Sequence, residues 1–418
     1  MSDKINLAHH IRERLPEDVI AFIRRAGEVA GRRQQRLYLV GGVVRDLLLE
    51  RHNLDLDLVV EGDAVKLAQE LAADLPGKLT IHPRFRTARL AWSRYSADFA
   101  TARAETYARP GALPEVKPGA IVDDLARRDF TINTMAVELN PNRFGELIDP
   151  RGGRSDLDNK LVRVLHVNSF VDDATRIWRA VRYEQRLDFR LEPKTLALVE
   201  QGLVWLDVIS GDRLRHELES VLKEELPEKC LSRAAGLGVL GKLNPSLRCD
   251  DWLAETFVQA RERYLPDALP PPELYIALLG YRLTVDEAEK LISSLRFPKA
   301  AARALRETIA LKENIGELSV PGLPPGRVYE LVHGYGPTAL TANSLAAGSA
   351  TAADHIELYL NVLRHVHPAL SGDDLLKLGV PQGPRIKEIL QALREARLDG
   401  RVTSKKEEEE LVRNWGKK

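Results

Sequence analysis

The order of apolar and polar positions divides the chain into a mixed N-terminal part and a helical remainder. Apolar residues recur at helical spacing through 1–35 and at strand spacing within 37–60. A helical pattern over 63–75 is ended by a proline and a glycine. Further short apolar runs predict strands at 79–82, 87–92 and 96–100. The first part of the chain should therefore form a small sheet with helices.

The last predicted strand covers 161–165, and from about residue 172 the pattern is that of helices with short breaks. Helix starts recur at 270–273 and 284–287, where early prolines or capping residues precede acidic residues. Proline and glycine gather in 320–326 and predict a break within this helical part. We predict an α+β protein whose sheet ends near residue 165.

Length and composition narrow the class of protein. A chain of 418 residues is too long for one core, so two to four domains are expected. Its 61 Lys and Arg balance 61 Asp and Glu, so a nucleic acid would have to be met by a local basic patch. Cys230 and Cys249 lack metal-ligand spacing, which is typical of a reduced cytosolic protein. Without a long apolar run or a signal-like N-terminus, we expect a soluble, cytoplasmic protein and no membrane partner.

The strongest chemical signal lies in 37–60. Gly41 and Gly42 separate a predicted strand from a short helix, and glycines at such a turn let backbone N–H groups approach a phosphate. Asp55 and Asp57 alternate with leucines on the next strand and so share one face. Two neighbouring carboxylates repel each other unless a cation lies between them, and a divalent metal is the usual one. A phosphate turn beside a metal site indicates nucleotide chemistry.

Two features near this site have open interpretations. Asp98, on a neighbouring predicted strand, is either a third metal ligand or an ordinary acid at a strand end. The polar segment 101–117, punctuated by Pro110, Gly111 and Pro114, predicts a loop. A long loop beside a catalytic sheet could act as a mobile flap.

Two arginine-rich segments follow. Arg127 and Arg128 precede Asn133, and a guanidinium can grip a triphosphate bidentately, although the residues alone favour ion pairs with the flanking aspartates. The segment 172–183 predicts a helix along which charged residues follow a three-residue step. This row is either a salt-bridged surface or a set of donors and acceptors for the edge of a base. Its members are Asp173, Arg176, Arg179 and Arg182.

Together these segments resemble the class II tRNA nucleotidyltransferase and bacterial poly(A) polymerase family. The resemblance covers about the first 215 residues and rests on ordered blocks: GGVVRD at 41–46, DLD at 55–57, RRDFTINTMA at 127–136, DPRGGRSDL at 149–157 and DDATRIWRAVRY at 172–183. It implies a nucleotidyltransferase (polymerase beta-like) mixed-sheet head followed by an all-helical neck, body and tail. The implied domains are 1–165, 166–215, 216–320 and 321–418.

The resemblance also implies a role for each candidate site residue. Asp55 and Asp57 would be the catalytic residues that bind the metal, Mg²⁺, as a pair of ions. The nucleotide-binding set begins with Gly42 and Arg45 at the phosphates. It continues with Arg128, with Asn133 near the ribose, with Asp173 and Arg176 at the Watson–Crick edge of CTP or ATP, and with Arg179 and Arg182. One departure from the family is Asp172 before Asp173, where the family usually has Glu-Asp.

The function implied is a tRNA nucleotidyltransferase that adds CCA from CTP and ATP without a nucleic acid template. The tRNA 3′-hydroxyl would attack the α-phosphate in line and release pyrophosphate. The alternatives are CC-only addition, A-only addition, poly(A) polymerisation and, from another class, a non-catalytic tRNA-binding protein. A flap at 101–118 that is not visibly shortened favours full CCA addition, and the presence of both Asp55 and Asp57 speaks against a non-catalytic protein.

The C-terminal part carries two further expectations. Gly383 and Pro384 stand at the start of a predicted helix whose exposed N–H groups could take a tRNA backbone phosphate, or the segment is an ordinary joint between helices. It resembles the family tail that grips the tRNA elbow. The basic and acidic run 405–410 predicts a solvated helix face. The sequence leaves the oligomeric state open.

Overall fold

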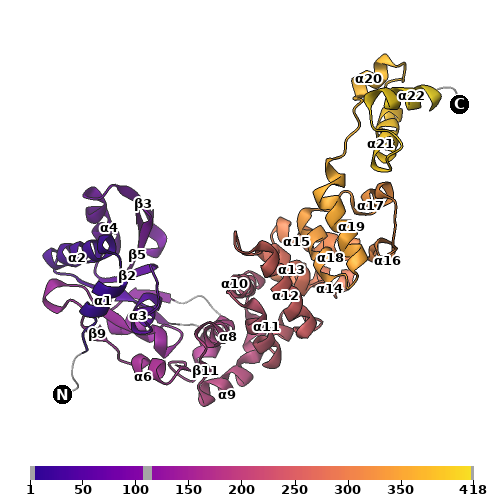
Figure 1. Ribbon diagram of the computed structural model, residues 1–418. Coiled ribbons are helices and arrows are strands. Elements are labelled where there is room, and N and C mark those ends of the chain that lie inside the picture. Colours follow the sequence, from indigo (N-terminus) through magenta and orange to yellow (C-terminus); the bar gives the residue numbers. More distant parts are fainter. Residues whose placement is uncertain (1–4, 107–114, 416–418) are drawn as a thin grey trace. The chain divides into compact units, whose positions relative to one another are not determined.

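The structure is a computed structural model that describes residues 5–106 and 115–415 (Figure 1). The chain forms two compact units. The first comprises Met1–Arg213 with Gly236–Lys242, and the second comprises Leu214–Ala235 with Leu243–Lys418. The finer division into head, neck, body and tail stays a prediction.

A seven-stranded mixed sheet organises the first unit, which confirms the predicted sheet with helices and the mixed sheet that the family resemblance implies. Strand β1 lies between β2 and β8 and is antiparallel to both, whereas β2 and β5 run parallel. The parallel pairing sets Asp57 directly beside Asp98. The strands, in spatial order, are β3 (Gly77–His82), β4 (Thr87–Trp92), β5 (Tyr95–Thr101), β2 (Leu56–Glu61), β1 (Arg36–Val40), β8 (Ala136–Glu138) and β9 (Leu147–Ile148).

Helices pack against this sheet through apolar stripes. In α2, Phe22 stacks on Trp92 of β4 with ring centroids 4.0 Å apart. Gly27 of the same helix has no room for a side chain, since a Cβ would lie 2.0 Å from the carbonyl oxygen of Leu139. Asp63 caps the next helix by accepting a hydrogen bond from the backbone N–H of Lys66. The first helices are α1 (Ala8–Arg14), α2 (Glu17–Arg32), α3 (Gly42–Leu48) and α4 (Ala64–Ala73).

The prediction of a loop over 101–117 is wrong at both of its ends. β6 (Arg103–Thr106) and β7 (Glu115–Pro118) pair as antiparallel strands of a separate small sheet. A polar strand pair without an apolar alternation leaves no strand signal in the sequence. The tip of the predicted flap, 107–114, lies outside the described residues.

The predicted end of the sheet near residue 165 is also wrong. The large sheet ends with β9, at Ile148. β10 (Leu161–Val162) pairs instead with β11 (Arg190–Leu191) in a parallel two-stranded sheet, so a short strand does occur beyond residue 172. These strands have two residues each, which is too short for any periodicity to reveal.

Helices dominate the rest of the described chain. The predicted starts near 272 and 284 are confirmed, and Thr284 forms a capping box with Glu287. Helices not yet bounded are α5 (Ile121–Ala126), α6 (Gly153–Asp158), α7 (Ser169–Asp172), α8 (Thr175–Leu187), α9 (Pro193–Gly202), α10 (Gly211–Leu222), α11 (Pro227–Gly236), α12 (Asp251–Tyr264), α13 (Pro272–Leu279), α14 (Val285–Leu295), α15 (Lys299–Lys312), α16 (Ile315–Leu318), α17 (Pro325–Val332), α18 (Pro337–Ala346), α19 (Ala350–Asn361), α20 (Gly372–Lys377), α21 (Pro384–Leu398) and α22 (Lys405–Trp415).

The C-terminal helices form a small core of their own around Leu375, Leu393 and Val412. Within α22, Glu408 is fully buried, so the prediction of a solvated acidic face is wrong at this residue. Its carboxylate accepts hydrogen bonds from the backbone N–H of Leu370 at 2.8 Å and of Ala369 at 3.0 Å. A buried carboxylate needs such partners, and a run of glutamates does not reveal which member will have them. Within the described residues, no helix has the length and apolar character needed to cross a membrane.

Candidate nucleotide-binding active site

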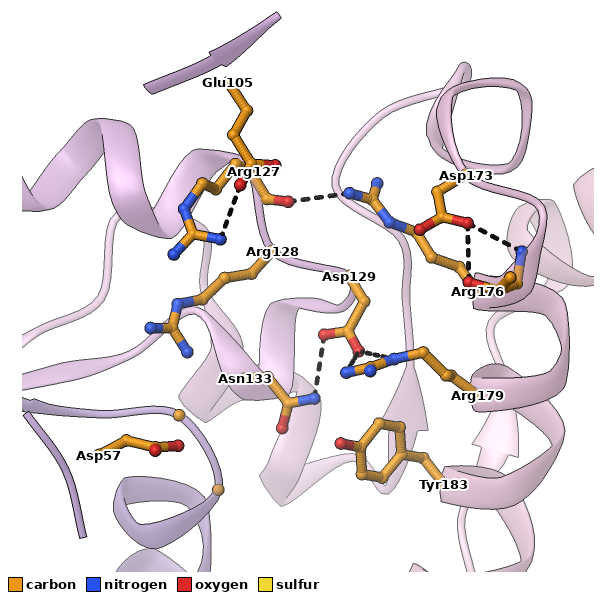
Figure 2. Close-up of a pocket in the computed structure, with 13 residues that line it drawn as sticks. Asp57, Glu105, Arg127, Arg128, Asp129, Asn133, Asp173, Arg176, Arg179 and Tyr183 are labelled. Carbon is orange, nitrogen blue, oxygen red and sulfur yellow. Dashed lines mark hydrogen bonds and ion pairs between the residues drawn. The ribbon is translucent and has the colours of Figure 1, made fainter. Parts of the chain in front are cut away.

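A polar cavity of about 350 Å³ lies within the first unit (Figure 2). Its walls come from the β1–α3 turn, β2, β6, the segment after α5, and α8 with the residue Asp173 before it. The lining residues are Gly41, Gly42, Asp57, Glu105, Arg127, Arg128, Asp129, Asn133, Asp173, Thr175, Arg176, Arg179 and Tyr183. Of the ten predicted site residues, the lining includes seven: Gly42, Asp57, Arg128, Asn133, Asp173, Arg176 and Arg179.

The turn between β1 and α3 requires glycine. Gly41 has a φ of +76°, which L side chains rarely adopt. A Cβ at this position would lie 2.8 Å from Nη1 of Arg128 and 3.7 Å from Oδ2 of Asp57. The backbone therefore passes between a cationic and an anionic side chain that both face the cavity.

Asp55 and Asp57 bracket the first residue of β2. Asp55 is exposed and precedes the strand, while Asp57 is partly buried within it. Burial, followed by the negative charge of Asp55, raises the pKa of Asp57 to about 6, although the charge of Arg128 opposes the shift. Carboxylate oxygens are the ligands that hard divalent cations prefer, and a cation would relieve this repulsion. The two residues therefore fit a divalent metal site.

Asp98 also raises the pKa of Asp57 through its charge. Its own carboxylate Oδ2 lies 3.7 Å from Nη1 of Arg89 on the adjacent strand β4. Among the residues that the structure describes, no group of three or more His, Cys, Asp or Glu side chains is arranged to hold a metal. The structure thus places Asp98 beside the pair without completing a three-carboxylate cluster.

Arg127 and Arg128 both contact Asp124, whose side chain is completely buried. Nη2 of Arg127 donates to Oδ1 of Asp124 at 2.7 Å, and Nη2 of Arg128 donates to Oδ2 at 3.0 Å. Arg127 also reaches Oε1 of Glu105 at 3.2 Å. The Nε of Arg128 is buried and has no hydrogen-bond partner among the residues that the structure describes. The ion-pair interpretation of the two arginines is therefore confirmed, and the ion pairs hold both side chains at the cavity wall.

Asp129 connects two other predicted residues. Its Oδ2 accepts hydrogen bonds from Nε of Arg179 at 2.8 Å and from Nη2 at 2.5 Å, and its Oδ1 accepts one from Asn133 at 3.1 Å (Figure 2). Burial by itself would raise the pKa of Asp129, but the charge of Arg179 and the hydrogen bonds from Asn133, Arg179 and the Phe130 N–H bring the pKa below its ordinary value. Asp129 is therefore charged at neutral pH and fixes Arg179.

Arg45 and Arg182, predicted at the nucleotide, are not part of the cavity lining. Arg45 is only 3% exposed; it donates to both carboxylate oxygens of Asp46 at 2.8 and 2.9 Å and to Oδ1 of Asn133 at 2.9 Å. The guanidinium carbons of Arg45 and Arg182 lie 5.3 and 5.5 Å from the ring centroid of Tyr183. Because Tyr183 and Asn133 line the cavity, the two arginines support its wall from behind.

The predicted helix over 172–183 is interrupted at Asp173. Asp173 has extended backbone angles and lies between α7 and α8, so it is not on one helical row with Arg176. Its Oδ1 accepts hydrogen bonds from the N–H and the hydroxyl of Thr175, at 3.0 and 2.7 Å, and lies 2.7 Å from Nη2 of Arg213. Arg176 donates to the carbonyl oxygen of Arg127 at 2.8 Å. Both side chains nevertheless face the cavity (Figure 2).

Several lining residues were absent from the sequence-based set. Asp129 and Tyr183 lie inside the recognised motifs. The sequence shows an acid and an aromatic residue there but does not indicate what either one does. Thr175 also lies inside such a motif, but its contact with Asp173 forms only in the folded chain. Glu105 lies outside the motifs and gave no signal.

The fold and the site together define a nucleotidyltransferase head domain. Residues 37–163 match the family model described as the poly A polymerase head domain. The chain is 32% identical to the A-adding tRNA nucleotidyltransferase of Halalkalibacterium halodurans over 98% of this chain and 96% of that protein. This chain belongs to the class II tRNA nucleotidyltransferase family.

Two other relatives show the range of activities in the family. The A-adding tRNA nucleotidyltransferase of Geobacter sulfurreducens is 34% identical over 96% of this chain, which spans only 48% of that protein. The CC-adding tRNA nucleotidyltransferase of Deinococcus radiodurans is 34% identical over 91% of this chain and 89% of that protein.

Solved structures of the same family are similar along the whole chain. A CCA-adding enzyme in an apo form has a TM-score of 0.85 at 32% identity, covering 99% of this chain and all of that one. The complex of a CCA-adding enzyme with ATP has a TM-score of 0.84 at 31% identity and covers all of both chains. The Thermotoga maritima CCA-adding enzyme in complex with tRNA has a TM-score of 0.78 at 31% identity over 99% of both chains.

Proposed function

We propose that this chain adds the nucleotides C, C and A to the 3′ end of tRNA from CTP and ATP, without a nucleic acid template. One observation carries the proposal: a single cavity is lined both by the carboxylate Asp57 and by the pair Asp173 and Arg176. A metal-binding carboxylate and a hydrogen-bonding pair for a base then serve the same bound nucleotide.

Asp55 and Asp57 would hold Mg²⁺. Bound there as a pair of ions, Mg²⁺ would favour ionisation of the tRNA 3′-hydroxyl and stabilise the in-line displacement of pyrophosphate. The protein's own contribution is to orient the nucleotide. Arg128 and Arg179 present guanidinium groups that are already fixed by Asp124 and Asp129, so little side-chain entropy is lost when they bind phosphate or ribose oxygens.

Asp173 and Arg176 suit the bases of CTP and ATP. Cytosine and adenine each present an exocyclic amino donor beside a ring nitrogen acceptor. Within the described part of the chain, the contacts of Asp173 fall on Oδ1, which leaves Oδ2 to accept from the amino group. Arg176 has five N–H donors and uses two on backbone carbonyls, so others can reach the ring nitrogen. Guanine and uracil present a keto oxygen beside a ring N–H. That order would set acceptor against acceptor at Asp173 and donor against donor at Arg176.

The experiment is a nucleotide panel on tRNA ending at the discriminator base, with CTP alone, ATP alone and both. Full CCA addition predicts that two C residues are added with CTP alone and CCA with both nucleotides. Extension of an unrelated RNA under the same conditions would instead indicate a poly(A) polymerase. Asp55→Ala should abolish incorporation of labelled CTP. Unchanged incorporation would refute the metal assignment. If the unaltered chain binds tRNA but incorporates no nucleotide, either into this tRNA or into tRNA ending in CC, the protein would be non-catalytic.

A-only addition is the second candidate function. The observation that favours it is that two relatives matching almost the whole chain, at 32% and 34% identity, are named A-adding. An A-only enzyme should incorporate nothing into the tRNA of this panel, but should add A from ATP to the same tRNA when it already ends in CC. CC-only addition, the activity in the name of the Deinococcus relative, predicts that no A follows the two C residues.

We also propose that the C-terminal helices contact the tRNA elbow, in the cytoplasm where tRNA is processed. Gly383 precedes α21 with a φ of +149°, and this 15-residue helix begins at Pro384. The N–H groups at a helix start are unpaired within the helix and favour phosphate oxygens. Replacing the exposed Arg385 and Lys387 by alanine should weaken binding of whole tRNA more than binding of a minihelix that lacks the elbow. Equal losses for both RNAs would refute the elbow contact.

A further inference from the structure

The backbone at Asp55 is held by a side chain rather than by the sheet. The parallel pairing of β2 with β5 begins at Leu56, so Asp55 lies one residue before the ladder. Its backbone N–H donates to Oδ1 of Asn53 at 2.8 Å. A side-chain oxygen that accepts the N–H two residues further on closes an Asx turn. The direction in which Asp55 leaves the turn therefore depends on Asn53.

Asn53 is itself fixed at its other end. Its Nδ2 donates to Oδ2 of Asp46 at 2.7 Å, and Asp46 is only 8% exposed. The orientation of the Asn53 amide follows from these partners, since a backbone N–H can only donate and a carboxylate can only accept. Arg45 donates to both oxygens of Asp46, so the carboxylate that holds Asn53 is charge-paired and immobile.

Further hydrogen bonds lead from Arg45 to the helix α8, which carries Arg179. Nη1 of Arg45 donates to Oδ1 of Asn133 at 2.9 Å, and Nδ2 of Asn133 donates to Oδ1 of Asp129 at 3.1 Å. Oδ2 of Asp129 then accepts from Arg179 of α8, as Figure 2 shows. The four residues between Asn53 and Arg179 are each at most 8% exposed. A continuous buried chain thus links a cavity-lining arginine to the backbone of Asp55.

We propose that Asn53 is a positioning residue for nucleotidyl transfer: it fixes the backbone from which the Asp55 carboxylate projects, and the buried chain holds Asn53 in place. The inference rests on the proposed function, because it takes Asp55 to be a metal ligand. A residue that orients a metal ligand acts on metal affinity and on the chemical step. It has little effect on nucleotide binding, which uses other side chains.

The test compares Asn53→Ala and Asn53→Ser with the matched control Asn6→Ala. Asn6 makes the same kind of turn, accepting from the N–H of Ala8 at 2.8 Å and donating to the carbonyl of Phe144 at 3.0 Å, but lies outside the cavity lining. The assays are kcat and KM for ATP and CTP on tRNA, Mn²⁺ binding followed by electron paramagnetic resonance without nucleotide, and thermal unfolding.

We expect Asn53→Ala to lower kcat and Mn²⁺ affinity, each on the order of 10–100-fold. The KM for nucleotide should change less than about twofold, the signature of an interaction that acts on the transition state. Asn53→Ser should recover part of the loss, because a serine hydroxyl can also accept the N–H two residues on, more weakly. Asn6→Ala should leave kcat and Mn²⁺ affinity at the wild-type values.

A purely structural role of Asn53 predicts a different result. Asn53→Ala and Asn6→Ala would then lower the unfolding temperature alike, while the folded Asn53→Ala protein keeps wild-type kcat and Mn²⁺ affinity, and the inference would be overturned. An effect confined to the KM for nucleotide would overturn the inference as well.

If Asn53→Ala fails to fold, the serine variant is compared with Asn6→Ala in the same assays. If the wild-type chain incorporates no nucleotide, the proposed function fails, and the Mn²⁺ measurement still tests the positioning of Asp55.

Discussion

Replacing Asp129 by asparagine tests the link between the nucleotide cavity and its buried support. Both oxygens of Asp129 accept hydrogen bonds, Oδ1 from Asn133 and the Phe130 N–H and Oδ2 from Arg179. An asparagine has only one oxygen, so its NH₂ group must face at least one of these donors. The orientation that spares Asn133 and the Phe130 N–H sets the NH₂ group against the guanidinium of Arg179.

The energetic cost follows from these contacts. Removing one partner of a fully buried ion pair costs about 3–5 kcal/mol. The Arg179 side chain is 37% exposed, so water can replace part of what Asp129 supplies. We therefore expect the free energy of unfolding to fall by about 1–3 kcal/mol, the range for leaving a buried hydrogen-bonding group without its partner. At about 2–4 °C per kcal/mol for a unit of this size, the unfolding temperature should fall by about 2–12 °C.

The loss of stability in Asp129→Asn should depend on pH in one direction only. The folded-state pKa of Asp129 is lowered, so its contribution to stability is present above the unfolded pKa of about 3.9 and is lost as pH falls through the folded value. The stability difference between wild type and Asp129→Asn should be constant from pH 8 to 5 and shrink only below about pH 4. A difference that disappears between pH 7 and 5 would refute the charged-pair interpretation.

The activity assay separates this site from a general loss of stability. Asp156→Asn is the matched control, because Asp156 is also 6% exposed and contacts Arg163 through both oxygens at 3.0–3.2 Å outside the cavity lining. Both variants should unfold at lower temperature. Only Asp129→Asn should raise the KM for nucleotide, by about tenfold, since it releases Arg179. Equal KM values for the two variants would refute the role of Asp129 at the nucleotide site.

Three further substitutions test other parts of the structure. Gly41→Ala forces a side chain into a positive-φ position 2.8 Å from Arg128, and should lower the free energy of unfolding by about 1–3 kcal/mol and weaken nucleotide binding in a filter assay. Asp173→Ala should blur the selectivity for C and A over G and U in a misincorporation assay more than it alters tRNA affinity. Glu408→Gln leaves one of its donors unpaired and should lower hydrogen-exchange protection in 366–371 and in α22, with nucleotide KM unchanged.

The sequence predicts the parts of the fold that repeat a pattern. The strands at 79–82, 87–92 and 96–100 and the helix stopped by Pro76 and Gly77 appear where their periodicity predicts them. β8 and β9 were not predicted, because strands of three and two residues contain no period and gain their stability from the partner strand alone.

The sequence predicts those site residues that lie in short local motifs. The proximity of Asp55 and Asp57 was expected from their spacing, although Asp55 lies just before β2 and not on it. The position of Asp173 outside α8 does not follow from its spacing to Arg176. The buried position of Arg45 is also invisible in the sequence, since arginines are mostly exposed unless a carboxylate compensates them, and Asp46 does so here. What the sequence misses is which charges neutralise one another in the folded chain.

That internal neutralisation bears on how a chain with no net charge meets a polyanion. Four arginines and four acids line the cavity, so its total charge offers no attraction. Arg127, Arg128 and Arg179 each contact a carboxylate. The contacts of Arg176 in the described chain are instead to backbone carbonyls, and its charge is therefore the least compensated in the cavity. A negative or electron-rich group should therefore meet its strongest attraction in the cavity at Arg176, whereas Arg128 and Arg179 are proposed to act on phosphate or ribose oxygens as oriented hydrogen-bond donors.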